Sequence, residues 1–103
     1  MTRDEDLAKA IAYFQQSQDK TLLQEVLRQL RPRAAAAVRR YQEHGTKVPS
    51  PREVVPAQDT ATEEEALHTV QAELDFGEIQ AITRAVGRRL ETLAQADPPG
   101  HDV

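Results

Sequence analysis

The two residues whose types and spacing come closest to a chemical motif are Glu65 and His68, in the stretch Glu65-Ala-Leu-His68. Residues three positions apart lie on one face of a helix, and Glu-x-x-His supplies ligands in carboxylate-bridged di-iron bundles. A complete site needs a second copy of the motif, which a homodimer would have to supply. The pair also lies in the first turns of a predicted helix, where glutamate is expected for capping. A surface role is therefore the simpler interpretation, and a dimeric helical metal protein is kept as an alternative.

No other residues of the chain form a catalytic or cofactor-binding motif. There is no Cys, which excludes disulfides, thiolate metal sites and catalytic thiols. The three histidines are too scattered for a zinc site, and neither Ser17 nor Ser50 lies in a nucleophile motif. The four glycines form no phosphate-binding loop. We therefore expect neither enzymatic activity nor a cofactor.

Charged residues are segregated along the chain. Residues 28–52 carry seven basic side chains and one acidic side chain, whereas residues 53–78 carry eight acidic side chains and no Lys or Arg. One interpretation is that the two blocks face each other across a helix pair or a dimer. The other is that the basic block forms a docking surface for an acidic partner, with Arg39 and Arg40 at that surface.

The basic block also raises a nucleic-acid alternative, because arginines bind phosphates. Residues 62–93 can in addition be interpreted as a helix-turn-helix, with Gly77 in the turn and Gln80, Thr83 and Arg84 on the recognition helix. The acidic first helix of that motif would repel DNA, and the net charge of −4 argues against general nucleic-acid binding. The residues of this alternative are Arg28, Arg31, Arg33, Arg39, Arg40 and Arg84.

Apolar residues recur at helical spacing, and β-structure has little support. A first helix is predicted over residues 4–17, and Asp19 or Thr21 is expected to cap the second helix. The second apolar stripe keeps its phase across Pro32, which predicts either a kinked helix or a tight corner between two helices. Gly45 is expected to end that segment.

A capping box of Thr62 and Glu65 is predicted to start the last helix, which continues to about residue 94. Its apolar stripe shifts by about 120° near Gly77, so either two helices meet there or one helix buries two different faces. We favour a continuous or slightly kinked helix, because one glycine costs only about 1 kcal/mol. Residues 45–61 are predicted to be a linker inside a single domain of residues 1–96, followed by a flexible tail.

The predicted fold class is all-α: a small bundle of about three to four helices, with a Pro-rich linker before a long C-terminal helix. Core residues are few, because Leu, Ile, Val and Phe together number 22 of 103. That shortage favours stabilisation by a partner or by self-association. No apolar run is long enough to span a membrane, and the acidic N-terminus does not resemble a signal peptide.

The leading functional interpretation is a cytoplasmic protein–protein interaction module. It would act as a regulator, an adaptor or an accessory subunit, and it would form a homodimer. The predicted partner-binding residues are Arg39, Arg40, Val70, Leu74, Ile79, Ile82, Val86 and Leu90.

Overall fold

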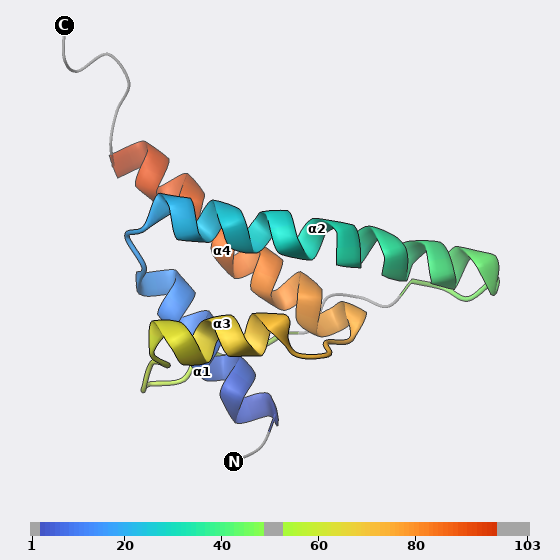
Figure 1. The fold of residues 1–103 in the computed structure, drawn as a ribbon, viewed down its shortest axis with the longest axis horizontal. Coiled ribbons are helices and arrows are strands. Elements are labelled where there is room, and N and C mark those ends of the chain that lie inside the picture. Colours follow the sequence, from blue (N-terminus) through green and yellow to red (C-terminus); the bar gives the residue numbers. More distant parts are fainter. Residues whose placement is uncertain (1–2, 49–52, 97–103) are drawn as a thin grey trace, which may run out of the picture.

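A computed structural model describes residues 3–48 and 53–96 of the chain, and those ranges form helices and connecting segments without a strand (Figure 1). The helices are α1 (Arg3–Gln16), α2 (Lys20–Glu43), α3 (Glu63–Gln71) and α4 (Phe76–Ala96). The predicted fold class, a small all-α bundle, is confirmed. The predicted tail at residues 97–103 and part of the predicted linker, residues 49–52, lie outside the described ranges.

The first two helices are joined by a short connection that ends in a capping aspartate. Leu7, Ile11 and Phe14 are spaced at helical intervals and form the buried face of α1. After α1 ends, the Asp19 carboxylate accepts a hydrogen bond from the backbone N–H of Leu22 at 3.1 Å and caps α2. Of the two predicted caps, Asp19 is the one that the chain uses.

Helix α2 continues without a break through Pro32, so the prediction of a tight corner between two helices is wrong there. Proline leaves the carbonyl four residues earlier, that of Arg28, without its helical partner. Both residues are exposed, so water can satisfy that carbonyl. The helix ends where expected, because Gly45 has a φ of 64°, a left-handed conformation that glycine adopts without strain.

The C-terminal part contains two helices, so the favoured prediction of one long helix through Gly77 is wrong. Thr62 and Glu65 form the predicted capping box at the start of α3. Helix α3 then ends at Gln71, and α4 begins at Phe76, which places Gly77 inside the first turn of α4. The change of phase in the apolar stripe therefore marks a change of helix.

A second capping box starts α4. The Asp75 carboxylate accepts from the backbone N–H of Glu78 at 2.8 Å, and the Glu78 carboxylate accepts from the backbone N–H of Asp75 at 2.9 Å. The Glu78 side chain is only 1% exposed. This reciprocal pair satisfies two backbone donors that a helix start leaves without partners.

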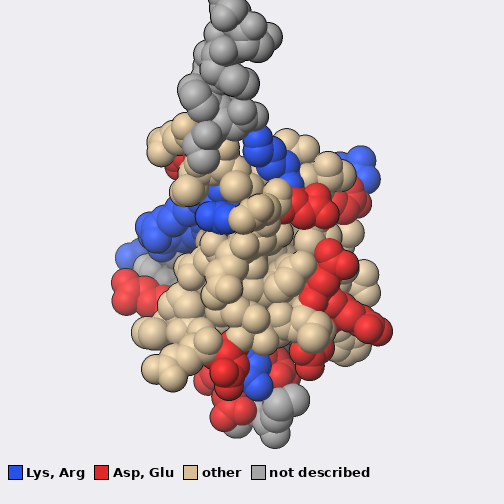
Figure 2. Space-filling view, turned by 90° about the vertical axis from the view of Figure 1, so that its left-hand side faces the viewer, with Lys and Arg blue, Asp and Glu red and all other residues tan. Residues whose placement is uncertain are grey.

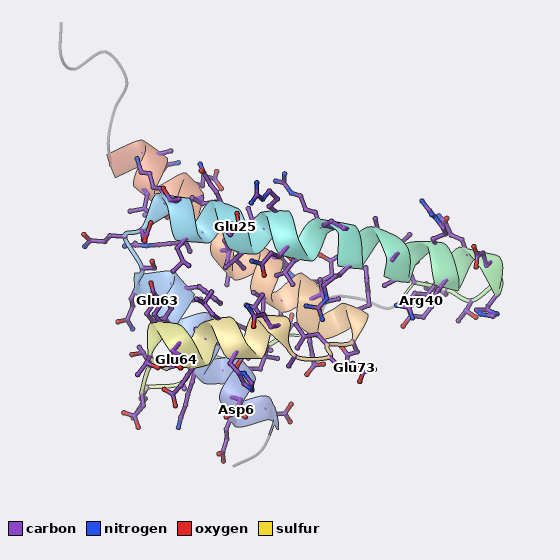
Figure 3. All side chains as sticks on the ribbon, viewed as in Figure 1. Asp6, Glu25, Arg40, Glu63, Glu64 and Glu73 are labelled. Carbon is purple, nitrogen blue, oxygen red and sulfur yellow. The ribbon has the colours of Figure 1, made fainter. Side chains whose placement is uncertain are left out.

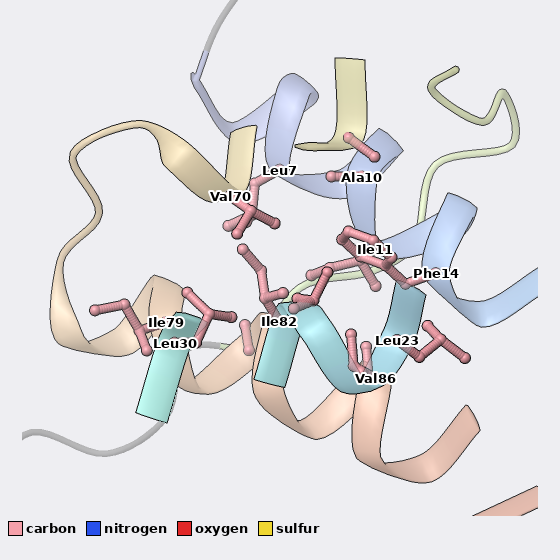
Figure 4. Close-up of a cluster of buried hydrophobic side chains, with 14 of the residues drawn as sticks. Leu7, Ala10, Ile11, Phe14, Leu23, Leu30, Val70, Ile79, Ile82 and Val86 are labelled. Atoms are coloured by element: carbon pink, nitrogen blue, oxygen red, sulfur yellow. The ribbon is translucent and has the colours of Figure 1, made fainter. Parts of the chain in front are cut away.

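The N-terminal half, α1 with α2, and the C-terminal half, α3 with α4, pack against each other so that the core lies between them. Helix α4 packs mainly against α2 and α1, and α3 packs mainly against α1 (Figure 1). All four helices contribute to one buried cluster, which includes Phe14, Leu30, Val70 and Ile82 (Figure 4). Neither half of the chain therefore has a separate core.

The described part of the segment before α3 lies against α1. The backbone N–H of Ala57 donates to Ala8 O at 3.3 Å, and that of Ala61 donates to Lys9 O at 3.2 Å. Val54 packs against the core, while the neighbouring Val55 is 85% exposed. Among the described residues, no helix is both long enough and apolar enough to cross a membrane.

Candidate functional site

The structure divides the eight predicted partner-binding residues into a core group and an exposed group. Val70, Ile79, Ile82 and Val86 are at most 3% exposed and belong to the core. The apolar residues Leu74 and Leu90 are partly buried and pack against that core. The prediction that these six form a docking face is corrected: the break between α3 and α4 turns both apolar stripes toward the same core. The homodimer remains a prediction, and its interface has to use other residues.

Arg39 and Arg40, in contrast, are exposed, as a docking surface requires. They lie near the C-terminal end of α2, which extends past the other helices at the right of Figure 1. Figure 3 places Arg40 far from the acidic residues Glu63 and Glu64 of α3. Among the described residues, neither arginine has a carboxylate partner.

A hollow of about 330 Å³ adjoins Arg40 at this end of α2. Tyr41 of α2 and Phe76 of α4 line it and contact each other edge to face, with ring centroids 6.1 Å apart. Arginine beside aromatic side chains is a combination enriched at protein interfaces. We call this region, Arg39 to His44 together with Phe76, the α2 end.

Arg28, Arg31 and Arg33, the other described arginines of the basic block, do not form one continuous phosphate-binding surface. Arg28 pairs with Glu25 on the same helix at 2.6 Å. Arg33 donates from its two terminal nitrogens to Val70 O at 2.5 Å and to Ala72 O at 2.7 Å. Arg33 therefore contacts the acidic segment through backbone carbonyls at the end of α3 and not through a carboxylate. Arg31 is exposed on α2.

The helix-turn-helix alternative gains no support from the residues placed on its recognition helix. Gln80 and Thr83 are half-buried, and the Thr83 hydroxyl donates to Ile79 O of its own helix at 2.7 Å. Arg84 is exposed, but it faces a hollow that the chain itself borders with residues 53–56.

That hollow is a site that sequence reasoning missed. It measures about 420 Å³ and lies between α1, α4 and residues 53–56, with Arg84 and Arg88 on its α4 side. The signal in the sequence was the spacing of these two arginines, four residues apart, which places them on one helix face. What the sequence did not reveal is that the segment before α3 returns to this face. We call it the α1/α4 groove.

Glu65 and His68, the metal alternative, lie in the first turns of α3. The Glu65 carboxylate accepts from the Thr62 backbone N–H at 2.9 Å, and the hydrogen bonds from Thr62 hold the pKa of Glu65 below its usual value. His68 borders a hollow of about 370 Å³ between α1 and α3. No group of three or more His, Asp or Glu side chains that could hold a metal ion occurs within residues 3–48 and 53–96. Glu65 thus does the capping expected of it.

Charges on the surface are distributed unevenly. Figure 2 shows one face on which acidic side chains cover much of the right and lower parts, while basic side chains gather at the upper left. Exposed guanidinium groups without a carboxylate partner can bind a carboxylate or phosphate through two hydrogen bonds. The α2 end and the α1/α4 groove each place such groups beside a hollow lined in part by apolar side chains. No protein-family model matches this chain, and neither a curated protein nor a solved structure does.

Proposed function

We propose that this protein is a small protein–protein interaction module, an adaptor or accessory subunit that binds an acidic segment of a partner protein at the α2 end. The observation that carries the proposal is the pair Arg39 and Arg40, both exposed on the part of α2 that extends beyond the bundle. Neither arginine has a carboxylate partner among the described residues. A docking surface of this kind also agrees with the lack of any catalytic motif in the chain.

The immediate surroundings of these arginines favour a protein over a polyanion. The adjoining hollow has aromatic walls, Tyr41 and Phe76, and the buried Ala37 also lines it. An apolar side chain of the partner can fill this hollow while its carboxylates pair with the arginines, which is the usual division between interface core and rim. The acidic net charge of the whole chain would at the same time repel nucleic acid.

A capture experiment with matched variants tests this proposal. The tagged wild-type protein, Arg39→Ala/Arg40→Ala and Arg84→Ala/Arg88→Ala are each used to capture proteins from a lysate of the source cells at low salt. The two double variants remove the same charge from different surfaces. We expect a stoichiometric partner that wild type and the Arg84/Arg88 variant retain and that the Arg39/Arg40 variant loses.

A titration with the purified partner then measures the effect directly. Loss of two exposed ion pairs should weaken binding by about tenfold. Equal capture of the partner by all three proteins would contradict a role for the α2 end. Binding of nucleic acid in place of a protein, detected by absorbance at 260 nm and lost as salt rises, would contradict the proposed class of partner.

A further inference from the structure

The α1/α4 groove is a second surface with features of a binding site, independent of the α2 end. Ile11 of α1 and Ala81 and Ala85 of α4 lie at its base, and polar side chains, among them Gln15 and the two arginines, border it. A smaller hollow of about 210 Å³ continues along α4 toward Arg89 and Thr92, and it shares Ala85 and Arg88 with the groove. The two hollows together extend along α4 from Ala81 to Thr92.

Arg84 and Arg88 border the α1/α4 groove, and within the described part of the chain neither side chain makes a contact that stabilises the fold. Both are exposed, and neither has a carboxylate partner or a backbone acceptor among the described residues. The next residue along the helix, Arg89, differs because its Nε donates to Ser17 O at 2.7 Å. The difference separates an arginine that holds the fold together from two that are free to bind a ligand.

The chain itself shows what kind of segment fits beside α1 and α4. Residues 53–56 form neither helix nor strand and border the groove on its outer side. Within them Val54 packs against the core while Val55 is exposed. An extended segment with one apolar residue directed inward is therefore compatible with this surface.

Charge and spacing define the ligand further. Arg84 and Arg88 are one helical turn apart, a separation of about 6 Å along the axis. Side chains two residues apart in an extended peptide are separated by about 6.6 Å and point the same way. Two carboxylates in the pattern acid-x-acid therefore match the two guanidinium groups. Glu53 lies on the opposite wall and would repel such a ligand, which places the carboxylates on the α4 side.

We propose that the α1/α4 groove binds an extended acidic segment of a partner protein, with carboxylates two residues apart paired to Arg84 and Arg88 and a neighbouring apolar side chain against Ile11, Ala81 and Ala85. A protein segment is preferred to a nucleic acid because Ile11, Ala81 and Ala85 can contact an apolar side chain, and because the net charge of −4 opposes binding of a polyanion. This surface is separate from the α2 end, so it can succeed or fail independently of the proposed function.

Two synthetic peptides of equal composition provide the probe. The first, Glu-Val-Glu-Val-Pro, has its carboxylates two residues apart, and the second, Glu-Glu-Val-Val-Pro, has them adjacent. Each is titrated into the 15N-labelled full-length protein, and dissociation constants are obtained from the amide shifts. We expect the first peptide to bind more tightly, with the largest shifts at Gln15 and residues 81–88.

Three variants test the contacts. Arg84→Ala/Arg88→Ala should weaken binding of the first peptide by about tenfold, whereas Arg31→Ala, at an exposed arginine outside both proposed surfaces, should leave it unchanged. Glu53→Gln removes the repelling charge and should tighten binding by about twofold to threefold. Circular dichroism checks that the groove variant is folded, which is expected because both side chains are exposed.

Several results would overturn the proposal. One is equal binding of the first peptide by wild type and the Arg84/Arg88 variant, and another is equal affinity for the two peptides. Preferential binding of a single-stranded oligonucleotide at the same amides would assign the groove to nucleic acid instead. Self-association that the Arg84/Arg88 variant abolishes would assign it to a second copy of this chain.

Discussion

The two short connections of this fold, residues 17–19 and residues 72–75, are constructed alike although their sequences differ. At each connection, an arginine from the other half of the molecule donates to backbone carbonyls at or just after the end of the preceding helix. Arg89 of α4 donates to Ser17 O, and Arg33 of α2 donates to Val70 O and Ala72 O. Each connection then ends in an aspartate, Asp19 or Asp75, that caps the next helix.

This similarity shows how a chain with few core residues can specify one arrangement. Each half contributes an arginine that satisfies carbonyls at the connection of the other half, where a helix end leaves acceptors without partners. The carbonyl end of a helix also carries partial negative charge, which favours a cation. The stability of the two connections and of the shared core therefore depends on the presence of both halves.

The largest loss of structure is expected when the two halves of the chain are separated. Peptides covering residues 3–48 and 53–96 should each lose most of their helicity, because the core lies between them. The first should keep more helix than the second, since α2 is long and rich in alanine. Circular dichroism at 222 nm measures both peptides and their mixture. Native-like helicity in either peptide alone would show that this half folds without the other, which would contradict the prediction.

The two arginines should then differ in importance. Arg33→Ala removes two charge-assisted hydrogen bonds and should lower the free energy of unfolding by about 2–3 kcal/mol, whereas Arg89→Ala removes one and should cost about 1–2 kcal/mol. Lysine has no planar fork, so Arg33→Lys should recover little and Arg89→Lys should recover more.

Urea denaturation of these four variants, with the exposed Arg31→Ala as a control for lost charge, measures the difference. If Arg33→Ala and Arg89→Ala were as stable as Arg31→Ala, the bonds to the turns would contribute nothing to stability. A larger loss for Arg89→Ala than for Arg33→Ala would reverse the expected order.

Local signals in the sequence predicted local structure well. The acidic start of α1, the caps Asp19 and Thr62, and the stop at Gly45 each depend on residues within one turn, and the structure contains all of them. The all-α class followed from apolar periodicity. The placement of the apolar stripes on α3 and α4 was predicted less well, because it depends on how the two helices turn relative to α1 and α2.

The contacts between the two halves could not be predicted from one sequence. Arg33 lies 37 residues from Val70, and Arg89 lies 72 residues from Ser17. No local pattern distinguishes these arginines from Arg31 or Arg84, which make no such contact. The α1/α4 groove was missed for the same reason, since one of its walls is formed by residues 53–56.

The start of α4 is different, because its signal was present and was overlooked. Asp75 and Glu78 have the spacing of a capping box, as Thr62 and Glu65 do. Gly77 suggested a turn, although glycine also occurs in the first turn of a helix, which is where the structure places it. Asp75 pairs with the buried Glu78 through two hydrogen bonds, so we expect the loss of this cap to cost more stability than the loss of the cap at Asp19.

The smallest effect concerns these two aspartates. Asp19→Ala removes one hydrogen bond at an exposed cap and should cost about 1 kcal/mol. Asp75→Ala should cost somewhat more, about 1–2 kcal/mol, because the backbone N–H of Glu78 loses its acceptor at a partly buried position.

Asparagine can also accept the capping bond, so Asp19→Asn and Asp75→Asn should both recover most of the stability. Urea denaturation measures all four variants. If Asp75→Ala were no more costly than Asp19→Ala, the buried environment of Glu78 would not strengthen this cap. The two connections would then be equivalent at their aspartates and would differ only in the number of carbonyls that each arginine holds.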